Sequence, residues 1–339
     1  MKYIFSKRVI TVAMSLAYLF PLSSQAEAQA DKNTNTGPSP NYSMGEFCKR
    51  LPRSDYEKLD RVDVDDLWFQ VYQVAPGVKA IYEPHQWQET ISYLIEGESK
   101  ALLFDTGNGI GDIHGLVKRL TNKPVSVLNS HSHFDHVGGN HAFKRIYGMN
   151  TAFTNQRQKG ISNKDISEEV SAAALCRPLP KGVSEKTHSG RPFKISKRIE
   201  DGYIFKLGGR RLEVIHVPGH TPDAIALIDR DHRLMWTGDT FYAGPIWLYA
   251  AETNLVAYGQ SIDRLLLELP NVTTLLPAHN TPIVSADLLP RLKHAFSKVM
   301  SGSAKRQESF DGTVIYSIEG ESAFSFLLRD NPFSYQPEN

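Results

Sequence analysis

Residues 129–143, NSHSHFDHVGGNHAF, place four possible metal ligands within six positions: His131, His133, Asp135 and His136. If a strand ends near Asn129, side chains two positions apart point the same way, so the first two histidines can reach one ion. The next two ligands then lie on the turn into a helix that the Gly138-Gly139 pair allows to start tightly. This spacing predicts two adjacent metal positions.

Four ligands in one segment give each of two ions too few donors, because zinc prefers four or slightly more nitrogen and oxygen donors. Three further candidates each follow a predicted strand. They are His220 in VPGHTPD, Asp239 in TGDT and His279 in LPAHN. Loops that follow strands are where an α/β scaffold usually places its chemistry.

The elements that must position these ligands are short apolar strands alternating with helices. Mixed hairpins and strand-helix units predict an α/β protein with helices outside paired sheets. Strands are predicted within residues 68–83, 91–107, 125–129, 206–217, 224–239, 272–278 and 312–328, and helices near 112–120, 255–269 and 287–300.

The motifs HSHFDH, PGHT, GDT and PAH, in this order, resemble those of the metallo-β-lactamase superfamily over roughly residues 68–300. The resemblance implies an αββα sandwich, two mixed β-sheets flanked by helices, with a dinuclear site at one edge. It implies one metal on His131, His133 and His220, the other on Asp135, His136 and His279, and Asp239 as the bridge. Two Zn²⁺ ions per chain are expected, although iron and manganese accept the same donors.

Asp105, in LLFDTG, matches an aspartate that typically ends an early strand near this site. We expect it to lie behind a histidine ligand and fix its tautomer. A purely structural turn cap is the alternative. The motifs do not require His141, five positions after His136, or the remaining histidines.

Two adjacent cations lower the pKa of a shared water from near 15.7 to about 7. We therefore expect a metal-bridging hydroxide to attack a carbonyl, with Asp135 orienting the water. No G-x-S-x-G motif supports a serine nucleophile. Tyr242, in GDTFY, resembles the tyrosine that lactone-opening members carry at this offset, so a catalytic contact is expected; packing beside Trp247 is the alternative.

Asp239 also bears on the substrate. The β-lactamase branches usually have cysteine or serine there, whereas lactonases, glyoxalase II and phosphodiesterases have an oxygen bridge. The aromatic segments 83–89 (EPHQWQE) and 242–249 (YAGPIWLY) indicate an apolar rim for an uncharged substrate, unless they cover the core. We predict a metal-dependent hydrolase of a lactone or other carboxylic ester. β-Lactam or phosphodiester hydrolysis, a mono-iron sulfur dioxygenase and a binding protein without activity stay open.

The N-terminus has the pattern of a secretory signal: Lys2, Lys7 and Arg8 precede an apolar run, residues 9–22, and A-x-A sites follow. The run is shorter than the roughly 20 residues that span a bilayer. We predict a cleaved signal peptide (1–30), a periplasmic or secreted protein and no stable membrane insertion; an uncleaved anchor is the alternative.

The rest of the chain divides into a flexible leader (31–64), one domain (65–330) and a tail (331–339). Within the domain, the polar stretch 156–197 is predicted to be an insertion loop, of the length that usually covers a site or is disordered.

Removing the signal changes the formal charge from +1 to about −1, because three cationic residues and one anionic residue leave with it. This balance lacks the basic face that nucleic-acid binding requires. A small-molecule substrate is therefore expected as the partner, while the oligomeric state stays open. Cys48 and Cys176 are enough for one disulfide in an oxidising compartment, but the sequence does not decide whether they meet.

Overall fold

The computed structural model describes residues 45–308 and 312–330. Its first sheet is mixed: strands β1 to β5 pair antiparallel and β5 to β8 pair parallel. The eight strands follow chain order, β1 Asp60–Val62, β2 Gln70–Ala75, β3 Val78–Tyr82, β4 Ile91–Glu96, β5 Ala101–Phe104, β6 Val125–Leu128, β7 Ile146–Met149 and β8 Lys197–Ile199.

The second sheet has the order β15-β14-β12-β11-β10-β9 and is also mixed, because β12 and β14 are parallel. Its strands are β9 Ile204–Lys206, β10 Arg211–His216, β11 Ile225–Asp229, β12 Leu234–Gly238, β14 Thr274–Pro277 and β15 Val284–Ser285. The period-two pattern of β4 explains how the sheets stack. Ile91, Tyr93 and Ile95 join the core between the sheets, whereas Leu94 packs in the core on the other face.

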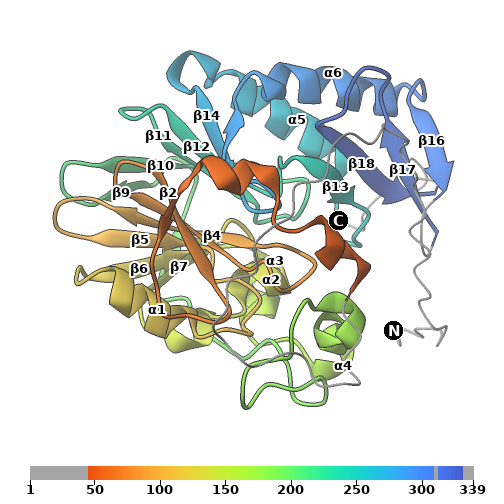
Figure 1. The fold of residues 1–339 in the computed structure, drawn as a ribbon. Helices are drawn as coiled ribbons and strands as arrows, with labels where there is room; N and C mark the ends of the chain where they lie inside the picture. Colours follow the sequence, from red (N-terminus) through yellow and green to blue (C-terminus); the bar gives the residue numbers. More distant parts are fainter. Residues whose placement is uncertain (1–44, 309–311, 331–339) are drawn as a thin grey trace. The chain divides into compact units, whose positions relative to one another are not determined.

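Helices cover the outer faces of both sheets (Figure 1). Helix α1 Ile113–Leu120 packs on the first sheet, and α5 Leu255–Leu266 and α6 Leu288–Met300 pack on the second. The α5 helix begins where Asn254 accepts a hydrogen bond from the Ala257 amide at 2.9 Å, and its apolar side chains recur at helical spacing. The predicted αββα sandwich is confirmed.

A third sheet adds to the two that the sequence predicted. The closing hairpin forms β17 Thr313–Ser317 and β18 Phe324–Arg329, and β18 pairs in parallel with β13 Gly244–Leu248. With β16 Lys305–Glu308 these strands make a separate four-stranded sheet. The segment 242–249, expected as a loop, is therefore mostly strand β13.

The prediction of a flexible leader is wrong for its described part. Residues 45–64 form the 3-10 helices η1 Glu46–Arg50 and η2 Ser54–Lys58 and strand β1. The ring of Tyr56 is buried and stacks on Tyr82 with centroids 4.2 Å apart, which anchors this segment. The predicted signal peptide and C-terminal tail lie outside the described residues.

The insertion 156–197 is folded onto the domain. After α3 Ala152–Arg157 it forms α4 Asn163–Ile166, η4 Ser167–Val170 and η5 Ala172–Ala174. A disulfide joins Cys176 to Cys48, 128 positions earlier. The Cys176 amide also donates to the carbonyl of His85, and the Trp87 amide donates to that of Ala174. The insertion is thus tied to the loop between β3 and β4.

Across residues 45–308 and 312–330, we find no helix with the length and apolar character needed to span a bilayer.

Candidate metal centre

Three strands of the second sheet deliver their ligands to the same edge. His220 follows β10, Asp239 follows β12 and His279 follows β14, and these strands run in one direction. The first sheet meets this edge at the end of β6, where the Ser130 carbonyl accepts a hydrogen bond from the Ile225 amide at 2.7 Å. Pairing between the sheets therefore brings the early motif to the three later ones.

The early motif contains a single helical turn, α2 Phe134–Val137, rather than an extended helix. Gly138 is needed for close approach, because a Cβ there would lie 2.4 Å from the backbone of Asn108. Gly238 has φ +51°, and a Cβ there would lie 2.6 Å from the Cβ of Ser130. Both glycines let the backbone segments carrying the ligands approach one another.

The first cluster contains three imidazoles. The Nδ1 atom of His133 lies 3.0 Å from Nε2 of His131 and 3.0 Å from Nε2 of His220. Three ring nitrogens at this spacing are all within reach of one cation.

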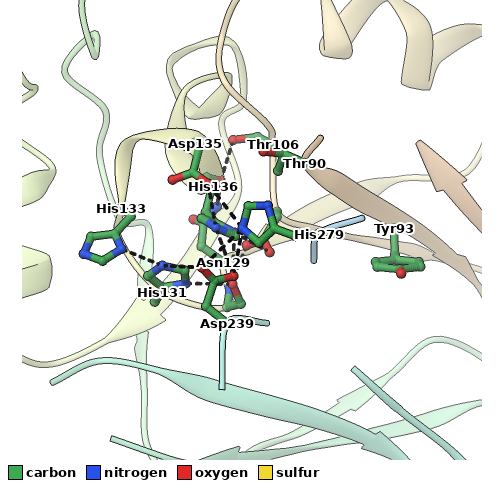
Figure 2. A network of polar contacts seen from close by, with 12 residues as sticks. Thr90, Tyr93, Thr106, Asn129, His131, His133, Asp135, His136, Asp239 and His279 are labelled. Carbon is green, nitrogen blue, oxygen red and sulfur yellow. Dashed lines mark hydrogen bonds and ion pairs between the residues drawn. The ribbon is translucent and has the colours of Figure 1, made fainter. Parts of the chain in front are cut away.

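The second cluster adds a carboxylate. Asp135 Oδ2 lies 3.0 Å from Nε2 of His136 and 3.5 Å from Nε2 of His279. Figure 2 shows these side chains gathered beside Asp239.

Asp239 lies between the clusters. Its Oδ2 is 3.5 Å from Nε2 of His220 in the first cluster, while its Oδ1 is 3.3 Å from His136 and 3.1 Å from His279 in the second. All seven residues predicted from the sequence as ligands are thus brought together, with Asp239 between the two clusters.

Outer contacts fix the tautomers of the ligands. The Nδ1 of His220 lies 2.8 Å from the Trp247 carbonyl, and the Nδ1 of His279 lies 2.7 Å from the Gln88 carbonyl. A carbonyl only accepts, so Nδ1 carries the proton and Nε2 keeps its lone pair for the centre. His133 has the opposite orientation, because its Nε2 lies 2.8 Å from Glu252 Oε1.

Asp105 lies behind His136, as expected. Its Oδ2 is 3.0 Å from His136 Nδ1, and its Oδ1 accepts a hydrogen bond from the Ser130 amide at 2.6 Å. Burial raises the pKa of Asp105, although His136 acts in the opposite direction. Asp105 also has φ +66°, so it shapes the turn after β5 while it contacts the ligand.

The electrostatics of the centre suit a cation. Burial works to raise the pKa of Asp239, but His279 and His136 hold it well below its usual range. Burial also works to raise the pKa of Asp135, which His136 and His279 hold below its usual range. Burial lowers the pKa of His220 to about 4. Burial works to lower the pKa of His136 and of His279, but Asp135 and Asp239 raise both, so a metal must compete with a proton at these two rings. Ionised carboxylates and neutral imidazole are the forms that bind metal.

Two atoms test whether the residues fit a metal. His136 Nε2 and Asp239 Oδ1 are buried and form no hydrogen bond of acceptable geometry within the described structure, although polar atoms of neighbouring ligands lie 3.0 to 3.3 Å away. Unsatisfied buried polar atoms are costly unless something else engages them. Nitrogen and carboxylate oxygen donors in this arrangement fit a transition metal such as zinc.

Tyr242 does not lie as a catalytic acid would. Its ring packs against His279 with centroids 5.1 Å apart, but its hydroxyl donates to the Pro245 carbonyl at 2.8 Å and accepts from the Trp247 amide at 3.0 Å. The expected catalytic contact is therefore disfavoured, because both hydrogen bonds hold the turn into β13. The packing alternative describes its position.

Two carboxylates near the site escaped the sequence analysis. Glu252 supports His133 and also pairs with Arg157 at 3.3 Å. Glu169, from the insertion, accepts hydrogen bonds from the indole of Trp87 at 2.8 Å and the amide of Gln86 at 3.1 Å. Neither glutamate has a motif or spacing that marks it.

Glu169 leads to a prediction on pH. Burial is the main cause that raises the pKa of Glu169 from an ordinary 4.5 to about 7. The hydrogen bond from Trp87 lowers this pKa, and the nearby charge of Asp135 raises it further. A raised pKa contributes stability that is present below pH 4.5 and lost as pH rises through about 7. In metal-free protein, Glu169→Gln should therefore raise the melting temperature by a few degrees at pH 8 and leave it unchanged at pH 4. Melting curves at both pH values test this, and equal shifts at the two would contradict it.

The comparison with known families agrees with this metal-centre geometry. The family model described as "Metallo-beta-lactamase superfamily" matches residues 87–279, more than half of the 339 residues. The chain belongs to the metallo-β-lactamase superfamily. The superfamily and the curated relatives below indicate a hydrolase.

Among these relatives is the acyl-coenzyme A thioesterase MBLAC2 of Gallus gallus, 27% identical over 225 residues, 62% of this chain and 80% of the relative. Another is the hydroxyacylglutathione hydrolase GloC of Haemophilus influenzae, 28% identical over 47% of this chain and 70% of its own. A solved sec-alkylsulfatase, Pisa1 from Pseudomonas sp., is 15% identical with a TM-score of 0.54, covering 68% of this chain and 42% of that one, a similarity of fold alone.

Proposed function

We propose that this superfamily member is a dinuclear, zinc-dependent hydrolase that cleaves a carboxylic ester, with lactones as the first candidates. The observation that carries the proposal is the place of Asp239. Its carboxylate lies within 3.5 Å of His220 in one cluster and of His136 and His279 in the other, so one side chain can serve two ions.

Metal ions held by these seven residues would polarise a carbonyl oxygen and make water acidic enough to attack at neutral pH. The protein's own groups do the rest. Asp135, ionised and buried, can accept a hydrogen bond from the attacking water and orient it toward the carbonyl. The outer contacts of His220 and His279 keep both rings in place throughout.

The rim of the site favours an uncharged acyl group. The indoles of Trp87 and Trp247 have centroids 5.0 Å apart, Tyr249 lies 5.3 Å beyond Trp247, and Phe153 lies 5.9 Å from His133. These aromatic rings are half-buried, so part of each surface is left for contact. With Glu169 also beside Trp87, the rim is poorly suited to a polyanion.

A thioester is the second candidate, and the relatives favour it. The curated names of two of them specify thioester hydrolysis, on acyl-coenzyme A and on hydroxyacylglutathione. A thioester presents the same carbonyl to the same ligands, so the substrate must be decided by experiment.

We also propose that the protein works outside the cytoplasm. The signal-like N-terminus motivates this, and the Cys48–Cys176 disulfide supports it, because such bonds persist in oxidising compartments. Detection of the mature chain in a periplasmic or culture fraction would test the proposal.

A substrate panel tests the function. Zinc-loaded protein should open a lactone or cleave an aryl ester faster than an acyl thioester, a β-lactam or a phosphodiester. Cleavage of the thioester alone would move the assignment to the second candidate, and cleavage of the phosphodiester alone would overturn the carbonyl chemistry. Metal analysis must give two zinc ions per chain; a single iron with oxygen uptake would instead indicate an oxygenase.

A further inference from the structure

Residues 45–59, here named the N-terminal strap, precede the part of the chain that matches the family model. The strap is held at its start by the Cys48–Cys176 disulfide and by a hydrogen bond from the Gly45 amide to the Leu175 carbonyl at 3.0 Å. Near its end, Tyr56 is buried against Tyr82. Between these anchors, Arg53 points its guanidinium at the metal-site loops.

Arg53 makes a forked contact with a buried carboxylate. Its Nε donates to Glu89 Oε2 at 2.7 Å, and its Nη2 donates to Glu89 Oε1 at 2.6 Å. Tyr82 donates a further hydrogen bond to the same carboxylate. The Glu89 side chain is only 5% exposed, whereas the Arg53 side chain is 33% exposed, so the carboxylate is shielded from water while the guanidinium is partly open to it. A forked pair of this kind is among the stronger hydrogen-bonded contacts.

The same guanidinium reaches a second loop. It donates to Asn280 Oδ1 at 2.9 Å, and Asn280 in turn donates to the Ala243 carbonyl at 2.7 Å. Glu89 and Asn280 both have left-handed backbone, with φ +48° and +67°. This conformation is disfavoured for a glutamate and persists there where surrounding contacts enforce it, whereas asparagine tolerates it more readily. Arg53 is the shared side-chain partner of both.

The two residues flank the contacts of one ligand. Asn280 follows His279 directly, and Glu89 follows Gln88, whose carbonyl accepts the Nδ1 hydrogen of His279. Thr90 forms a β-bridge with His279, and the Asn280 amide reaches the Glu89 carbonyl at 3.4 Å. The backbone on both sides of the Gln88–His279 hydrogen bond is therefore clamped by one arginine.

We infer that Arg53 is a positioning residue for His279, so that the strap completes the second metal position from outside the family's matched region. The inference rests on the proposed metal centre but not on its substrate. Loss of Arg53 leaves Glu89 without its cation and releases both left-handed residues. The Gln88 carbonyl then no longer fixes the tautomer and orientation of His279.

Zinc binding to the full chain, measured by competition with a chromogenic chelator, tests the inference. Arg53→Met should weaken one of the two binding steps about 10–100-fold, the usual effect of removing a residue that orients a ligand, and leave the other unchanged. Arg53→Lys, which keeps the charge but not the fork, should weaken the same step less. The matched control is Arg230→Met, which removes another forked pair, with Glu268, and should change neither step.

A double-mutant cycle separates positioning from general damage. In a His279→Ala background, Arg53→Met should have no further effect on zinc binding, because the ligand it positions is absent. Unchanged affinities in Arg53→Met, or an undiminished loss in the His279→Ala background, would overturn the inference. If Arg53→Met does not fold, the zinc affinities of Arg53→Lys are compared in the wild-type and His279→Ala backgrounds instead.

A second readout needs no metal. In metal-free protein, the Nδ1 hydrogen of His279 should exchange slowly with solvent, as seen by imidazole NMR, and exchange faster in Arg53→Met. Equal exchange in the two proteins counts against the inference. A wild-type chain that binds no zinc contradicts the proposed function instead, while this exchange measurement still tests the strap.

Discussion

Asp239→Ala should remove bound metal and lower hydrolysis by a factor on the order of 10³, because Lewis-acid assistance contributes several kcal/mol and each 1.36 kcal/mol is tenfold in rate. The carboxylate approaches residues of both clusters, so its loss removes a donor from each. Metal content and turnover of the purified variant measure the effect.

The control is Asp263→Ala, which removes a carboxylate that pairs with Lys293 on the surface. That variant should keep both metal ions and full turnover. If Asp239→Ala did the same, with two metals and normal turnover, Asp239 would not be the bridge and the proposed centre would be wrong.

Loss of the disulfide should have the largest effect on stability. Cys48 and Cys176 close a loop of 128 positions. In the chain-entropy model a cross-link of this length lowers the entropy of the unfolded chain by an amount worth about 5 kcal/mol. Replacing both cysteines by alanine should reduce the free energy of unfolding by that amount, as measured by urea denaturation.

Reductant supplies the control for this experiment. Dithiothreitol should lower the stability of the wild-type chain toward that of the double variant and leave the double variant unchanged. A difference of less than about 1 kcal/mol between oxidised wild type and variant would contradict the predicted stabilisation by the loop closure.

The sequence by itself determined the ligand set and the layers. His220, Asp239 and His279 each follow an apolar strand, and the apolar pattern predicted the strands that place them. Such local signals work because a buried strand needs alternating apolar side chains, and because strands running in one direction end at one edge. In the early motif, residues 129–143, the residue types and their spacing were enough to predict metal ligands.

Only the tertiary structure decided the contacts that depend on backbone atoms or on residues far apart in the chain. The hydroxyl of Tyr242 is engaged by backbone groups of Pro245 and Trp247, which no residue type announces. The support of His133 by Glu252 joins residues 119 positions apart, and the Cys48–Cys176 bond and the Arg53 clamp on the His279 loop are equally nonlocal. A sequence pattern records which side chains a segment must bury, whereas the partner across such a distance is set only when the whole chain packs.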